Sequence, residues 1–67
     1  MSLYWDSTYA IVLDLMAHYP DIEVDSVGLV QLHQMIVTLP DFADEPRQVD
    51  DATLTDILVE WYEEANT

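Results

Sequence analysis

The chain has 67 residues, of which 51% are hydrophobic and 14 are aspartate or glutamate; Arg47 is its single cation of fixed charge, so the formal net charge is −13. This composition is too apolar for an acidic disordered tail, and because cysteine is absent it excludes disulfides and thiolate metal sites. We expect one folded domain over residues 1–67. The net negative charge destabilises this domain by self-repulsion. We therefore expect a counter-charge from outside the chain: a basic protein surface, a metal cation or both.

The first predicted element is a helix over about residues 7–18. Asp6 and Ser7 are favourable N-cap residues, and Pro20 ends the helix near Tyr19. One apolar stripe at helical spacing is formed by Ile11, Val12, Leu15 and Tyr19. A second apolar row is either additional core or an exposed surface that promotes self-association of an otherwise monomeric protein. This row consists of Tyr9, Leu13, Met16 and Ala17.

A loop or short turn over residues 21–28 precedes the second predicted helix. Apolar residues recur every three or four positions from Leu29 to Leu39, and Pro40 stops the helix. The stretch from Ser26 to Pro40 has no formal charge unless His33 is protonated. A neutral helix in so charged a chain is predicted to be the central and most buried one.

The third helix follows an acidic loop, residues 41–50, and is capped by Asp50 or Asp51. Its predicted inner face comprises Leu54, Ile57, Leu58, Trp61 and Ala65. Three short helices around one core indicate a mainly α fold that resembles a helix-turn-helix, with room for a small strand pair.

The outer side of the third helix is strongly acidic. Its carboxylates are three or four residues apart and therefore neighbours: Asp56, Glu60, Glu63 and Glu64. Each like-charge pair at this spacing costs about 0.2–0.5 kcal/mol, and anions are disfavoured at a helix C-terminus. This face is either a solubilising surface or a docking face for a basic partner.

The loop before the third helix gathers three carboxylates within five residues, Asp41, Asp44 and Glu45. Oxygen ligands of this kind suit hard divalent cations such as magnesium, manganese or ferrous iron. Without imidazole or thiolate they would bind weakly, and a solvated loop is the other reading. His33 is expected to be a structural hydrogen-bonding residue.

Several function classes find no support in the sequence. Six acids and no base on the third helix would repel phosphates, which excludes nucleic-acid binding; an acidic DNA-mimic inhibitor stays open. No local signature arranges a catalytic triad, and we expect no enzymatic activity. No apolar segment is long enough to span a membrane and no signal peptide is evident, so a cytoplasmic location is expected.

A second alternative comes from Asp25-Ser26-Val27 at the head of a helix. This tripeptide resembles the Asp-Ser-Leu phosphopantetheine site of acyl carrier proteins, which are also small, acidic and helical. Val27 replaces the usual leucine, however, and too little chain precedes Ser26 for the long first helix of that family. A turn or cap role for Ser26 is therefore favoured.

One set of short motifs extends over essentially the whole chain: Trp5 with Asp6-Ser7, Tyr19-Pro20-Asp21, Leu32-His33-Gln34, Asp41-Phe42, Pro46, Ile57-Leu58, Trp61 and Glu64-Ala65. No single motif is decisive, but their joint spacing resembles that of the IscX (YfhJ) family, small acidic proteins of bacterial iron–sulfur cluster assembly.

The resemblance implies a modified winged-helix-like fold with an acidic surface. It also implies binding to the cysteine desulfurase IscS, where the family modulates sulfur delivery, and weak iron binding at surface carboxylates. We therefore assign iron contacts to Asp41, Asp44 and Glu45. Partner contacts are assigned to Asp56, Glu60, Glu63 and Glu64. The second apolar row of the first helix departs from the family, which tends to be more polar there.

Overall fold

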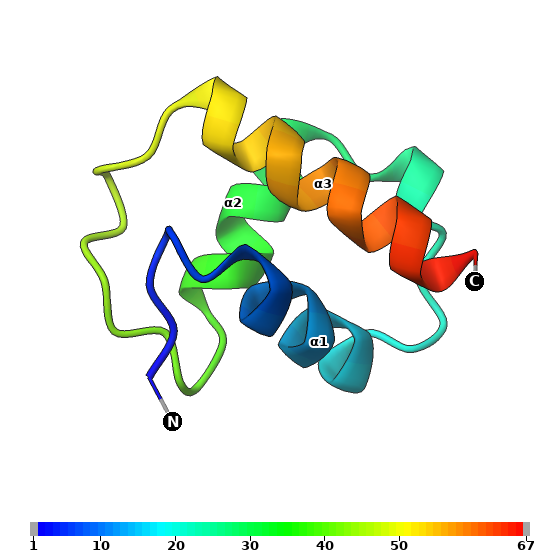
Figure 1. Ribbon diagram of the computed structural model, residues 1–67, viewed down its shortest axis with the longest axis horizontal. Helices are drawn as coiled ribbons and strands as arrows, with labels where there is room; N and C mark the ends of the chain where they lie inside the picture. Colours follow the sequence, from blue (N-terminus) through cyan, green and yellow to red (C-terminus); the bar gives the residue numbers. More distant parts are fainter. Residues whose placement is uncertain (1, 67) are drawn as a thin grey trace.

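The computed structural model of the protein describes residues 2–66, and helices account for most of them (Figure 1). In chain order they are α1 (Thr8–His18), a short 3-10 helix η1 (Val24–Ser26), α2 (Leu29–Val37) and α3 (Asp51–Ala65). The predicted mainly α fold with three α-helices is confirmed. None of the helices in this part of the chain has both the length and the apolarity needed to cross a membrane.

The central element is α3, because it packs against α1, α2 and η1. The prediction that the neutral helix α2 is central is therefore wrong. The prediction that it is the most buried helix holds by share of residues, since three of its nine are buried, against three of eleven in α1 and three of fifteen in α3. Helix α2 buries one face only and leaves Val30 81% exposed. Gln31 and Gln34 are exposed on the same helix. The longest helix, in contrast, has enough surface to contact every other element.

The apolar stripe of α1 is confirmed. Ile11, Val12 and Leu15 are fully buried, and they face α3 and α2 in the core. The second row is mainly surface, since Tyr9 and Leu13 are 55% and 46% exposed. Within this row Met16 alone packs against the core. Self-association through this surface stays a prediction.

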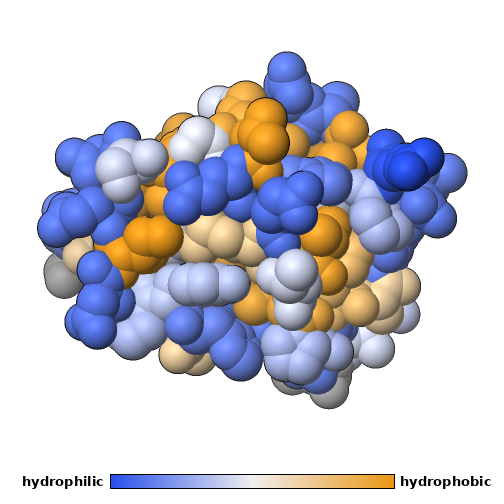
Figure 2. Space-filling model, turned by 180° about the vertical axis from the view of Figure 1, so that it is seen from behind, coloured by the Kyte–Doolittle hydropathy of each residue, from blue (hydrophilic) through white to orange (hydrophobic). Residues whose placement is uncertain are grey.

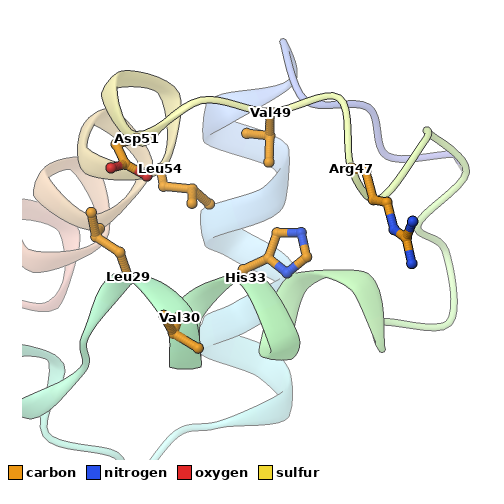
Figure 3. Close-up of a pocket in the computed structure, with 7 residues that line it drawn as sticks. All are labelled: Leu29, Val30, His33, Arg47, Val49, Asp51 and Leu54. Atoms are coloured by element: carbon orange, nitrogen blue, oxygen red, sulfur yellow. The ribbon is translucent and has the colours of Figure 1, made fainter.

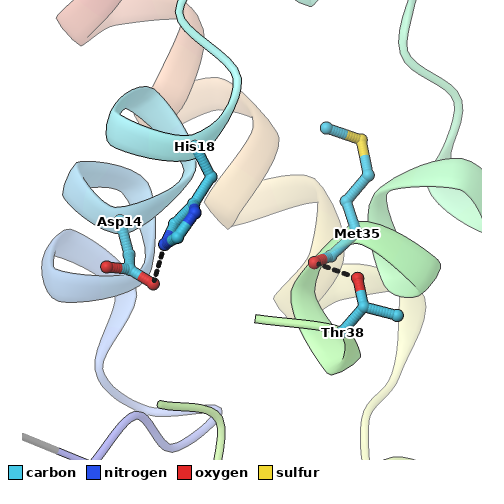
Figure 4. Close-up of polar contacts among 4 residues, drawn as sticks. All are labelled: Asp14, His18, Met35 and Thr38. Carbon is cyan, nitrogen blue, oxygen red and sulfur yellow. Dashed lines mark hydrogen bonds and ion pairs between the residues drawn. The ribbon is translucent and has the colours of Figure 1, made fainter. Parts of the chain in front are cut away.

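The helix ends follow local chemistry. Asp50 caps α3 by accepting a hydrogen bond from the Thr53 amide at 2.8 Å, which confirms one of the two predicted caps. The second helix is shorter than predicted and ends at Val37. There the Thr38 hydroxyl donates to the carbonyl of Met35 at 3.0 Å (Figure 4). Such a side-chain bond competes with continuation of the helix, so α2 ends before Pro40.

The N-terminal segment lies along the loop that follows α2 (Figure 1). Leu3 and Phe42 form an isolated parallel β-bridge. Its bonds run from the Leu3 amide to the Asp41 carbonyl (2.8 Å) and from the Ala43 amide to the Leu3 carbonyl (2.9 Å). Within residues 2–66 this bridge stands in place of the small strand pair, and the winged-helix-like detail of the fold stays a prediction.

The hydrophobic core contains residues from the N-terminal segment, from η1 and from all three α-helices. Besides the helical stripes it contains four residues from segments that were expected to be loop or aromatic lead-in: Leu3, Trp5, Val24 and Val27. On α3 the inner face is confirmed for Leu54, Ile57 and Trp61, which are buried, and Leu58 packs against them. Ala65 is exposed instead, because it lies in the last turn of α3.

Candidate functional site

The acidic side of α3 is accessible to a partner. Asp56 and Glu63 are exposed, and Glu60 and Glu64 are half-exposed. None of these side chains lies in the core, whose α3 contribution is Leu54, Ile57 and Trp61, so the structure brings all four onto the solvent side of a single helix. The four predicted partner-binding residues therefore form one continuous surface, which we call the α3 acidic face.

The C-terminal end of α3 is an unfavourable place for negative charge. The last turn of the helix has no basic residue, although the helix dipole favours cations there and disfavours Glu63 and Glu64. Arg47, the one cation of fixed charge, lies in the loop before the helix and lines a pocket at its other end. No basic side chain in the last turn of α3 therefore compensates Glu63.

The loop carboxylates differ in role. Asp44 is half-buried and accepts hydrogen bonds from the Trp5 amide at 2.9 Å and the Glu45 amide at 2.7 Å. These two bonds hold the pKa of Asp44 below its ordinary value of 3.8, because they stabilise the ionised form. Asp41 and Glu45 are exposed. Asp44 therefore fastens the N-terminal segment to the loop.

The structure does not assemble the loop carboxylates into a ready metal centre. Across residues 2–66, no group of three or more histidine, aspartate or glutamate side chains is arranged to hold a metal ion. One oxygen of Glu45 lies 3.5 Å from the Arg47 amide, and both oxygens of Asp44 already accept backbone hydrogen bonds. Weak iron binding at Asp41, Asp44 and Glu45 stays a prediction.

Trp5 connects three parts of the chain, a role that the sequence did not indicate. Its indole Nε1 donates to the Glu45 carbonyl at 2.7 Å. The ring stacks on His33 with centroids 5.8 Å apart and makes a T-shaped contact with Phe42, with centroids 4.9 Å apart. The Nε2 atom of His33 lies 2.6 Å from the Pro46 carbonyl oxygen. These contacts confirm the structural, hydrogen-bonding role expected for His33.

A pocket of about 330 Å³ lies above α2 and beside the first turn of α3. Figure 3 shows that His33 stands between Asp51 on one side and Arg47 on the other. The rest of the lining is aliphatic and includes Leu29 and Leu54. The pocket is open, and it contains one cation and one anion. It therefore has no net charge that would select an ionic ligand.

Two further polar features belong to the fold. On α1, the Nε2 atom of His18 lies 3.7 Å from the Oδ2 atom of Asp14, one turn earlier (Figure 4). In η1, the hydroxyl of Ser26 donates to the carbonyl of Glu23 at 2.7 Å. This bond gives Ser26 the turn role that the sequence favoured over a carrier-protein attachment site.

The surface combines this charge with exposed hydrophobic groups. No charged side chain in residues 2–66 is buried. On the side of the molecule seen in Figure 2, hydrophobic side chains reach the surface between hydrophilic ones. An acidic surface with exposed hydrophobic side chains is suited to contact with a protein that offers both basic and apolar groups.

Comparison with known proteins places the chain in a family. A family model described as iron-sulphur cluster assembly matches residues 3–66. The uncharacterized protein PA3808 of Pseudomonas aeruginosa is 33% identical over 64 residues, which cover 96% of this chain and 97% of the relative. Both matches extend over nearly the whole chain, including α3 and the loop before it.

Proposed function

Because the chain belongs to the iron-sulphur cluster assembly family, the family that the IscX resemblance indicated, we propose that it is a non-enzymatic accessory protein of cluster assembly. Its partner is the cysteine desulfurase IscS, and docking uses the α3 acidic face. In this role the protein regulates sulfur delivery by occupying a basic surface of the enzyme. With no cysteine in the chain, it does not hold a cluster through thiolates.

The observation that carries this proposal is the exposed, continuous α3 acidic face at the end of a helix with no basic residue in its last turn. Holding these carboxylates side by side costs folding energy. A complementary basic surface would remove that cost and would also speed association by electrostatic steering. Docking therefore gives a physical reason for a feature that destabilises the free protein.

Calorimetric titration against purified cysteine desulfurase tests the proposal. We expect measurable binding at about 50 mM salt and much weaker binding at about 500 mM, because salt screens exposed charge pairs. Undetectable heat of binding at low salt would eliminate docking on this enzyme. Binding that is equally tight at both salt concentrations would eliminate the α3 acidic face as its basis.

We propose in addition that the loop binds ferrous iron weakly through Asp41, Asp44 and Glu45, since carboxylate oxygens accept hard cations. Ferrous iron is titrated anaerobically into nitrogen-15-labelled protein, and paramagnetic broadening of amide signals is mapped. We expect the first signals to broaden around residues 41–45. Broadening that begins on α3 would move the site there, and no broadening at millimolar iron would remove it.

A further inference from the structure

A mostly apolar groove lies between η1 and the C-terminal half of α3. Its cavity volume is about 240 Å³. The groove is lined by the buried residues Val24 and Val27 and by Leu58. Val59 and Tyr62 of α3 also line it, and each is 51% exposed. Val59 and Tyr62 extend the apolar stripe of α3 around the helix.

Carboxylates border the groove on both sides. On the η1 side Asp25 lines it directly, and Glu23 lines the adjoining hollow, which shares Tyr62 with the groove. On α3, Asp56 and Glu63 lie three residues before and four residues after Val59, so they are its neighbours on the helix surface. Both are exposed. The groove is therefore an apolar strip between two anionic edges.

We propose that this groove receives an apolar side chain from a basic segment of the partner protein, while lysine or arginine residues flanking that side chain reach the carboxylates on either edge. The inference rests on the docking function proposed above and names the anchoring contact within it. Charge complementarity selects this occupant: a second copy of the chain or an acidic segment would be repelled by both edges.

The size of the groove also favours a side chain over a metabolite. Pockets for small molecules and cofactors are typically about 300–1,000 Å³ and enclose most of the ligand, whereas this groove is smaller and open along one side. Interfaces commonly place an aromatic or aliphatic anchor in such a depression, surrounded by polar contacts that exclude water. Tyr62 and Val59 supply the apolar area that the anchor covers.

The test compares two double variants of the full chain. Val59→Ala with Tyr62→Ala removes two residues that line the groove. Tyr9→Ala with Leu13→Ala removes a similarly exposed tyrosine and aliphatic residue from α1, which contributes no lining residue to the groove. All four residues are surface-exposed, so both variants are expected to fold, which circular dichroism and urea unfolding verify. Affinity for the desulfurase is measured at low and intermediate salt.

We expect the groove variant to bind about tenfold more weakly at both salt concentrations, because an apolar contact is not screened, and we expect the α1 variant to bind like the wild type. An unchanged groove variant would overturn the inference and leave docking through the α3 acidic face intact. Equal losses in both variants, or a loss at low salt only, would also overturn it. A wild-type protein that fails to bind would overturn the docking function itself.

Discussion

Trp5 shows how one residue can fix the relation between distant parts of a small chain. Its amide and its indole nitrogen bond to positions 39 and 40 residues away, and its ring lies between the loop and α2. A domain of 67 residues buries only about 60% of its unfolded surface. We therefore expect contacts that join three segments to contribute to its stability.

Asp44 makes the stability of the protein depend on pH. Hydrogen bonds from the Trp5 and Glu45 amides lower its pKa, so its contribution is fully present above the unfolded-state pKa of about 3.8 and is lost as the pH falls through the lower folded-state pKa. We expect Asp44→Asn to be less stable than the wild type at pH 7 and to lose less stability on acidification below pH 4.

Urea unfolding between pH 2 and pH 7 measures this difference. Asp41→Asn is the matched control, because the Asp41 side chain makes no hydrogen bond within residues 2–66, and it should follow the wild-type curve. Asp50, whose pKa is lowered by the hydroxyl and amide of Thr53, contributes equally in all three proteins. Parallel pH curves for Asp44→Asn and wild type would contradict the assigned role.

His33 should matter for folding and not for docking. Replacing it with alanine removes the contact between Nε2 and the Pro46 carbonyl and the stacking on Trp5, and we expect the free energy of unfolding to fall by about 1–2 kcal/mol. His33→Phe, which keeps a ring on Trp5, should lose less. Chemical denaturation measures the stability of the variants, and calorimetric titration measures their affinity for the desulfurase. A folded His33→Ala protein that no longer binds the desulfurase would show that the residue is functional.

At the scale of elements, the helices could be predicted from the sequence, but the helix that packs against all the others could not. The stripes of α1 and α3 are local patterns, so the buried residues Ile11, Leu15, Ile57 and Trp61 follow from spacing alone. The grouping of the α3 carboxylates on one face was predictable for the same reason, since residues at helical spacing share a face. Trp5 and Asp44, in contrast, meet through a contact 39 residues apart in sequence, which no local period encodes.

On the α3 acidic face, the carboxylates that the proposed docking requires are expected to lower the stability of the free protein. Asp56 with Glu60 and Glu60 with Glu63 are like-charge neighbours, each pair costing about 0.2–0.5 kcal/mol. We expect the triple variant Asp56→Asn, Glu60→Gln, Glu63→Gln to raise the free energy of unfolding by about 0.5–1 kcal/mol, measured by urea unfolding at low salt. A triple variant less stable than the wild type would mean that these carboxylates make favourable contacts in the fold.

At the scale of the whole molecule, the net charge of −13 should make salt stabilise the free protein. The Debye length falls from about 30 Å at 0.01 M to about 8 Å at 0.15 M, which screens the self-repulsion of the carboxylates. We expect the urea midpoint to rise over this range. A midpoint that stays constant or falls would mean that attractive pairs already neutralise the surface within the chain.

The most direct test of docking through the α3 acidic face is a comparison of two triple variants that lose the same number of negative charges. One is the α3 variant described above, and the other carries Asp6→Asn, Asp41→Asn and Glu45→Gln, which lie outside α3 in the N-terminal segment and in the loop that follows α2. Affinity for the cysteine desulfurase is measured for both, and for the wild type, over a series of salt concentrations.

We predict that the α3 variant binds at least about tenfold more weakly at low salt and with a shallower dependence on salt, because each lost charge pair removes a screened interaction. The loop variant should stay close to the wild type in both respects. Equal losses in the two variants would show that net charge alone attracts the partner, and a loss confined to the loop variant would place the docking surface around residues 41–45. Either result would contradict docking through α3.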